Sequence, residues 1–127
     1  MENKMNLEEV VSGELVASGP ETTMEDLASL MESEGVGSVA ILDPHGDFLG
    51  IVTDRDIVRA VAEGQSRAVA AKDFMTVMVD TIDLNTDVAD AVDWMNATGY
   101  RHLPVTQNGR LIGMVSIKDL LWAIAST

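Results

Sequence analysis

The sequence predicts an α/β (α+β) protein made of two β-α-β-β-α repeats that pack sheet to sheet with pseudo-two-fold symmetry. The stretch GIVTDRDIVRA (50–60) returns as GMVSIKDLLWA (113–123), with a glycine, a hydroxyl and an aspartate at the same places. Hydrophobic residues make up 46% of the 127 residues, enough for a packed core. One small unit can hardly bury both faces of its sheet, whereas two copies packed together can. The duplication therefore predicts that the hydrophobic core forms where the two copies pack together.

The repeat extends over most of the chain. An offset of 64 residues places Thr22, Asp26, Met31 and Gly35 on Thr86, Asp90, Met95 and Gly99. One extra residue in the turn DPHGDF (43–48) then shortens the offset to 63, which places Gly50, Thr53 and Asp56 on Gly113, Ser116 and Asp119. The alignment predicts an N-terminal extension at 1–13, repeat 1 at 14–64, a linker at 65–77 and repeat 2 at 78–127.

Each repeat is expected to begin with a short strand, at 15–18 and 79–82, and to continue with a helix. Apolar residues at helical spacing predict the helices, namely Met24, Leu27, Ala28 and Met31 in one repeat and Val88, Ala91, Val92 and Met95 in the other. The candidate N-caps are Thr22 or Thr23 and, in repeat 2, Asn85 or Thr86. Gly35 and Gly99 stand where a left-handed glycine would end each helix.

Two strands and a last helix should complete each repeat. The expected strands are 39–42, 48–52, 103–106 and 111–115, and Asn108-Gly109 is a strong signal for a two-residue hairpin turn. The expected last helices are 54–63 and 117–125. Residues 68–74 of the linker and the stretch NLEEVV (6–11) also have helical tendency.

Composition excludes several classes of protein. The net charge is −13, so the chain lacks the cations that would replace the counterions of a nucleic acid. There is no cysteine, which excludes disulfides and thiolate metal sites. The N-terminus resembles no signal peptide, and the longest apolar run, 120–125, is too short to cross a membrane. We therefore expect a cytoplasmic protein that binds neither nucleic acid nor membrane.

The repeated hydroxyl and aspartate allow two interpretations. Thr53-x-x-Asp56 and Ser116-x-x-Asp119 each lie where a strand should lead into a helix. A hydroxyl followed three residues later by an acid resembles a capping box, a purely structural device. The same junction also suits a nucleotide, because a helix N-terminus attracts phosphate and a carboxylate accepts ribose hydroxyls.

Cations gather near these junctions although the chain is acidic. Arg55 and Lys118 lie inside the two motifs, and Arg101 lies on a neighbouring element. These residues favour the phosphate interpretation. Arg59 is better read as part of a solvated helix face.

The stretches GVGSVAILDPHGDFLGIVTDRDIVRA (35–60) and GYRHLPVTQNGRLIGMVSIKDLLWA (99–123) resemble the two halves of a tandem CBS-domain pair, also called a Bateman module, here stand-alone. The resemblance runs from about residue 15 to residue 125. One copy of the motif alone would be weak, but two copies in register are fairly specific. The resemblance implies the fold stated above.

The resemblance also implies a ligand: AMP, ADP, ATP, S-adenosylmethionine or NAD, bound in clefts between the repeats. Asp56 or Asp119 would hold the ribose, while Thr53, Ser116 and nearby cations would face the phosphates. The pocket-lining candidates are Ala17, Thr81, Arg101, His102, Leu103 and Pro104. Repeat 1 has Gly37-Ser38-Val39-Ala40 in place of the last four, so we expect two unequal sites.

The function implied is a regulatory sensor that passes its ligand state to an effector protein. Such pairs commonly dimerise through their helices. Trp94, Met95, Leu121 and Trp122 are large apolar residues suited to that surface, although ordinary burial in the core explains each of them more simply. The alternative is a ligand-independent dimerisation scaffold whose motifs are only helix caps. We see no nucleophile paired with a base and no metal-ligand spacing, so we expect neither an enzyme nor a metal or other required cofactor.

Overall fold

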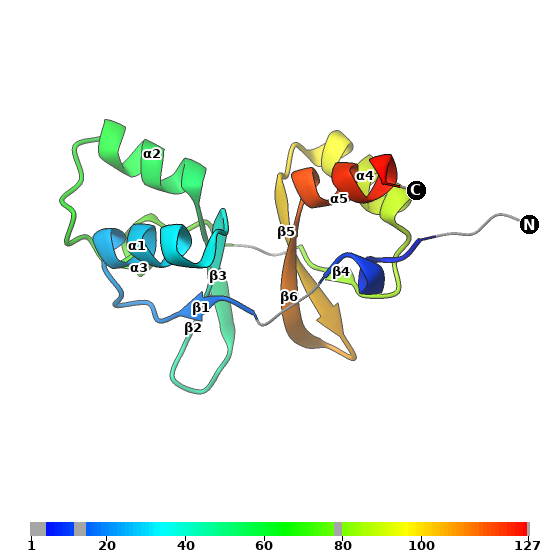
Figure 1. Ribbon diagram of the computed structural model, residues 1–127. Coiled ribbons are helices and arrows are strands. Elements are labelled where there is room, and N and C mark those ends of the chain that lie inside the picture. The colour runs from blue at the N-terminus through cyan, green and yellow to red at the C-terminus, as the bar shows by residue number, and fades with distance from the viewer. Residues whose placement is uncertain (1–4, 12–14, 78–79, 127) are drawn as a thin grey trace, which may run out of the picture. The chain divides into compact units, whose positions relative to one another are not determined.

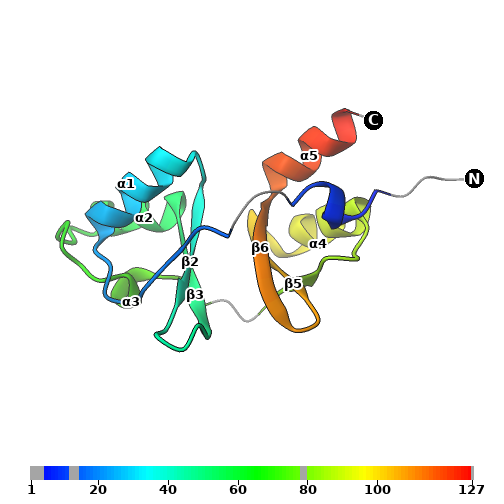
Figure 2. The same ribbon diagram turned by 60° about the horizontal axis from the view of Figure 1, so that its bottom comes forward.

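The computed structural model describes residues 5–11, 15–77 and 80–126. These residues form two compact units (Figure 1). The repeat 1 unit contains residues 16–77, and the repeat 2 unit contains residues 5–11, 15 and 80–126. Each unit has its own three-stranded sheet, and helices cover one face of it (Figures 1 and 2). The predicted α/β class with two repeats is confirmed.

The repeat 1 unit follows the predicted order of elements. These are β1 (Ala17–Ser18), α1 (Met24–Glu34), β2 (Ser38–Leu42), β3 (Phe48–Thr53), α2 (Asp54–Ala62) and the short α3 (Ala71–Phe74). The strand order is β1-β2-β3, with β1 parallel and β3 antiparallel to β2. This topology brings the C-terminal end of β3 directly into α2, where the motif lies.

The repeat 2 unit has the same topology. Its elements are the 3-10 helix η1 (Leu7–Glu9), β4 (Ile82–Asp83), α4 (Val88–Thr98), β5 (His102–Gln107), β6 (Arg110–Ser116) and α5 (Ile117–Ala125). The strand order is β4-β5-β6. Asn108 and Gly109 both have positive φ, at 54° and 77°, so the predicted tight hairpin turn is confirmed. None of the described helices is long and apolar enough to span a bilayer.

Of the four predicted ends of α1 and α4, three are confirmed. Thr23 caps α1 by accepting a hydrogen bond from the N–H of Asp26, and Gly35 and Gly99 end α1 and α4 in the left-handed region. The predicted cap of α4 is wrong, because its N-cap is Asp87 rather than Asn85 or Thr86. Thr86 lies in the turn that follows β4, and its carbonyl accepts a bond from Leu7.

The two cores use the same positions. Six buried residues form the core cluster of the repeat 1 unit: Leu27, Met31, Val39, Ile41, Val52 and Ala71. The residues 64 or 63 positions away are all buried in the repeat 2 unit: Ala91, Met95, Leu103, Val105, Val115 and Leu7. Leu7, in the predicted N-terminal extension, is thus the counterpart of Ala71 in the predicted linker.

Backbone hydrogen bonds show the same correspondence. Ala71 donates to the carbonyl of Thr22 at 2.8 Å, as Leu7 donates to that of Thr86 at 3.0 Å. The helical tendency expected at 68–74 and 6–11 appears as α3 and η1. Each unit is therefore completed by a segment that precedes the other repeat in the chain.

Candidate ligand-binding site

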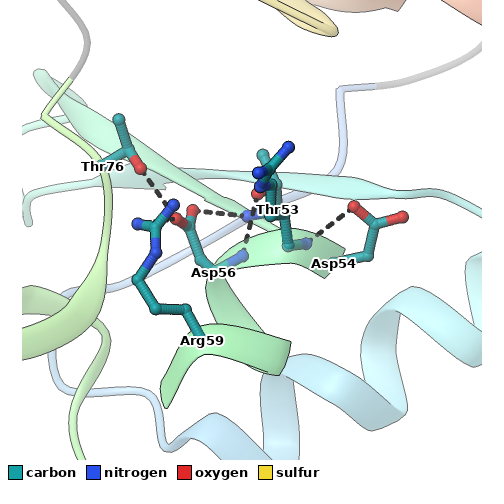
Figure 3. Close-up of polar contacts among 6 residues, drawn as sticks. Thr53, Asp54, Asp56, Arg59 and Thr76 are labelled. Atoms are coloured by element: carbon teal, nitrogen blue, oxygen red, sulfur yellow. Dashed lines mark hydrogen bonds and ion pairs between the residues drawn. The ribbon is translucent and has the colours of Figure 1, made fainter. Parts of the chain in front are cut away.

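The repeat 1 motif lies where β3 passes into α2. Thr53 is the N-cap of α2, and its Oγ1 accepts a hydrogen bond from the N–H of Asp56 at 3.2 Å. The carboxylate of Asp56 accepts one from the N–H of Thr53 at 2.9 Å (Figure 3). The capping box expected under the structural interpretation is therefore complete here.

Two further side chains hold Asp56. The hydroxyl of Thr76 donates to Oδ1 at 2.8 Å, and the Arg59 guanidinium lies 3.5 Å from the same oxygen (Figure 3). Only 3% of Asp56 is exposed, so its carboxylate is desolvated and tied to the protein itself. Arg59, expected on a solvated face, is 58% exposed but also forms this ion pair.

Sequence reasoning missed Thr76, because it lies twenty residues from its partner in a segment treated as a linker. One signal was available. Ser12, at the counterpart position 64 residues earlier, also carries a hydroxyl, although it lies outside the described residues.

The repeat 2 motif lies where β6 passes into α5. The hydroxyl of Ser116 caps α5 by accepting from the N–H of Asp119 at 3.1 Å. Within the described part of the chain, the reciprocal bond from Ser116 to the Asp119 carboxylate is absent, and Asp119 is exposed. The two motifs are therefore alike in sequence but differ in how available the carboxylate is.

Cationic and polar candidates surround the repeat 2 motif. The N–H of Ile117 donates to the carbonyl of Arg101 at 2.8 Å, and His102 is the register partner of Ser116. Arg101 and Lys118 are exposed, and His102 is half-buried. The structure thus brings Arg101, His102, Ser116, Lys118 and Asp119 to one end of the β5–β6 pair.

The remaining candidates lie close by in the sheets. Pro104 is buried opposite Met114, and Leu103 occupies a core position with no exposed surface. Thr81 is exposed and directly precedes β4, which pairs with β5.

In the repeat 1 unit the corresponding region has fewer side chains to offer. Ala17 on β1 pairs with Ala40, and Arg55 is exposed in the first turn of α2. The N–H of Asp54 donates to the carbonyl of Gly37 at 3.0 Å, as Ile117 does to Arg101. A glycine therefore stands where repeat 2 has a cation.

A second contact that the sequence did not predict lies beside Arg101. The hydroxyl of Tyr100 donates to Oδ2 of Asp80 at 2.9 Å, and this hydrogen bond raises the pKa of Tyr100. The bond ties the loop carrying Arg101 to the segment that leads into β4. The counterpart residues in repeat 1, Val36 and Val16, are apolar and pack against the core cluster.

Two units of the same β-α-β-β-α topology, each with a hydroxyl–aspartate motif at the start of its last helix, define a duplicated α/β fold. The family model of the CBS domain matches residues 7–63 and 71–126. The chain therefore belongs to the CBS-domain family and carries two copies of the domain. The matches begin at Leu7 and Ala71, the two counterpart core residues.

Two curated relatives cover most of the chain. A 17.7 kDa protein of Acidianus ambivalens is 38% identical over 83% of this chain and 64% of its own length. A protein of Methanopyrus kandleri is 35% identical over 89% of this chain and 59% of its own length. The chain thus spans about three-fifths of the length of these relatives.

Solved structures share the fold. A CBS-domain-containing protein from Agrobacterium tumefaciens is 30% identical, with a TM-score of 0.88 over 95% of this chain and 94% of its own. A CBS domain protein from Pyrobaculum aerophilum complexed with AMP is 23% identical, with a TM-score of 0.83 over 97% and 100% of the two chains. A CBS domain pair in complex with 5′-methylthioadenosine and S-adenosyl-L-methionine is 20% identical, with a TM-score of 0.88 over 98% of both.

Proposed function

We propose that this chain is a regulatory module that binds an adenosyl ligand at its CBS motifs and signals the bound state to an effector protein. The observation that carries the proposal is the repeat 2 junction. There an exposed carboxylate, Asp119, a capping hydroxyl, Ser116, and the cations Arg101 and Lys118 lie together at the start of α5. AMP, 5′-methylthioadenosine and S-adenosylmethionine in two proteins of the same fold support the adenosyl class.

The roles follow from the chemistry of each group. Asp119 accepts the ribose hydroxyls, as acidic residues do in dinucleotide sites. The N-terminus of α5, Ser116, Arg101, His102 and Lys118 face the phosphates or another polar substituent. Thr81, which is exposed, lies against the adenine, and the buried Leu103 and Pro104 shape the strand beside it. Thr53, Arg55, Asp56 and Ala17 form the corresponding but less available site of repeat 1.

Signalling requires that the ligand bind one arrangement of the protein more tightly than another, because only this difference shifts an equilibrium. We propose a homodimer as one carrier of that change. Large apolar side chains lie on the helices of the repeat 2 unit, with Leu121 52%, Trp122 75% and Trp94 46% exposed. Met95 is 2% exposed, which agrees with core burial, the simpler of the two explanations for this residue.

The test is thermal melting of the protein with AMP, ADP, ATP, S-adenosylmethionine, NAD and GTP. A ligand at a hundred times its dissociation constant stabilises the folded state by about 2.7 kcal/mol, which is several degrees for a domain of this size. We expect a shift with an adenosyl compound that Asp119→Ala abolishes. Asp93→Ala is the matched control, because it removes an exposed carboxylate from α4. No shift with any compound would refute the proposal.

The second candidate is a dimerisation scaffold that needs no ligand. It is favoured by the complete capping box at Thr53 and Asp56, which gives that motif a structural role. Light scattering, which measures the oligomeric state, tests for the dimer with and without each compound. Trp122→Glu should break a dimer built on α5, and Gln107→Glu, an exposed change on the β5–β6 hairpin, should not. A dimer insensitive to every compound in the panel would support the scaffold.

A further inference from the structure

The end of the linker is attached to β3. Thr76 and Ile51 exchange two backbone hydrogen bonds, of 2.9 Å and 2.8 Å. Gly50 permits this approach, because a β-carbon at position 50 would stand 2.5 Å from the carbonyl oxygen of Thr76. The linker therefore reaches the motif of repeat 1 as an ordered strand-like segment.

The side chain of Thr76 also forms a hydrogen bond to one oxygen of the Asp56 carboxylate. Its hydroxyl donates to Oδ1 of Asp56, and the N–H of Thr53 donates to Oδ2 (Figure 3). A ribose would offer the same kind of group, a hydroxyl donor, to the same acceptor. A carboxylate that is 3% exposed cannot accept ribose hydroxyls unless one of its present partners moves.

We propose that the Thr76 hydroxyl is an internal competitor for the ribose position at Asp56, so that a ligand entering the repeat 1 motif must detach Thr76. This inference rests on the proposed adenosyl function, and it adds a mechanism that regulates binding at the repeat 1 motif. Thr76 weakens binding at repeat 1, and its release converts ligand binding into a change in the linker. Asp119 is exposed, so repeat 2 takes the ligand first.

Of the two side chains on Oδ1, Thr76 is the one that competes. Arg59 lies farther from the oxygen, at 3.5 Å against 2.8 Å, and more than half of its side chain is exposed, so it can turn away into solvent. Thr76 is fixed by its two backbone bonds to Ile51. Displacing its hydroxyl therefore requires a rotation of the side chain or a shift of the linker itself.

The experiment measures binding at repeat 1 in a chain whose repeat 2 motif is weakened. Asp119→Asn weakens the repeat 2 motif, and calorimetric titrations with AMP and with S-adenosylmethionine compare three chains in that background: Thr76, Thr76→Val and Thr76→Ser. Thr76→Val removes a hydrogen bond to a charged group, which the ligand would otherwise have to break. From the usual strength of such bonds, we expect Thr76→Val to bind the ligand at least about tenfold more tightly than the parent. Thr76→Ser keeps the hydroxyl and should bind like the parent.

Equal or weaker binding by Thr76→Val and by a second variant, Thr76→Ala, would overturn the inference, and so would no binding by any of these chains. Amide exchange tests the change in the linker: exchange at Thr76 should become faster when AMP or S-adenosylmethionine saturates the Asp119→Asn chain. Unchanged exchange would overturn the claim that release of Thr76 alters the linker. Asp119-dependent binding by the otherwise unmodified chain tests the proposed function separately, so either one can fail alone.

Discussion

Leu7 donates its backbone N–H to the carbonyl oxygen of Thr86, and its side chain is completely buried. A segment that the sequence presents as an extension thus contributes to the core of the repeat 2 unit. We expect Leu7→Ala to lower the free energy of unfolding by about 2–5 kcal/mol, as for other buried leucines. Calorimetric melting measures the loss, with Glu9→Ala, an exposed change in the same turn, as the control. Equal stability of the two variants would contradict the role of Leu7 in the core.

Gly50 and Gly113, three residues before the hydroxyl of each motif, are required because other atoms of the chain lie too close for a β-carbon. A β-carbon at position 50 would meet the backbone oxygen of Thr76 at 2.5 Å, and one at position 113 would meet Cγ1 of Val11 at 2.6 Å. We expect Gly50→Ala to destabilise the fold by about 1–3 kcal/mol, the usual cost of overpacking, because backbone must move. Gly113→Ala should cost less, because a single side chain has to give way.

Two controls test this interpretation by urea unfolding. Gly19→Ala should be nearly neutral, because a β-carbon there meets no atom within 4 Å. Val11→Ala should remove most of the cost of Gly113→Ala in a double-mutant cycle and none of the cost of Gly50→Ala. A cycle with no coupling between Val11 and Gly113 would show that the contact is unimportant.

The repeat made much of this fold predictable. The helix 117–125 has the predicted bounds, and Gly35 and Gly99 end their helices as expected. Five of the six strands differ from prediction by at most two residues at either end, whereas the strand expected at 79–82 is described only at Ile82–Asp83. These features depend on local patterns, namely apolar spacing, caps and turn residues. The duplicated pattern also located both hydroxyl–aspartate motifs at strand-to-helix junctions.

The features that the sequence did not predict depend on contacts between distant segments. The Thr76–Asp56 bond spans twenty residues, and the Tyr100–Asp80 bond spans the whole of α4. The role of Leu7 was missed because its partners are about eighty residues further along the chain. The difference between Asp56 and Asp119 has the same origin, since the two motifs match in sequence and differ in what packs against them.

The two aspartates should respond differently to the same substitution. Asp56→Asn puts an amide where both carboxylate oxygens accept hydrogen bonds, so we expect a loss of about 1.5–3 kcal/mol in unfolding free energy. Asp119→Asn changes an exposed side chain and should cost no more than about 0.5 kcal/mol. Urea unfolding without ligand measures both, and similar losses would mean that the two carboxylates are held alike.

Tyr100 provides a test by titration, because it is the only tyrosine in the chain. Its hydrogen bond to Asp80, followed by burial and the charge of Asp80, raises its pKa above the usual 10.0. The stabilisation that goes with this shift is therefore complete below the pKa of the unfolded chain, and it is lost as the pH rises through the higher pKa of the folded chain. Ultraviolet absorbance of tyrosinate follows the titration directly.

Asp80→Ala should lower the pKa of Tyr100 toward the usual value, and Asp80→Asn, which keeps an acceptor without the charge, should give an intermediate pKa. The control is Asp93→Ala, which removes an exposed carboxylate from α4 and should leave the titration unchanged. Tyr100→Phe removes the hydroxyl, so it should also remove the contribution of Tyr100 to the pH dependence of the unfolding free energy in this range. A titration of Tyr100 that is the same with and without the Asp80 carboxylate would show that the bond is not formed in solution, and the loop carrying Arg101 would then lack this attachment to the segment before β4.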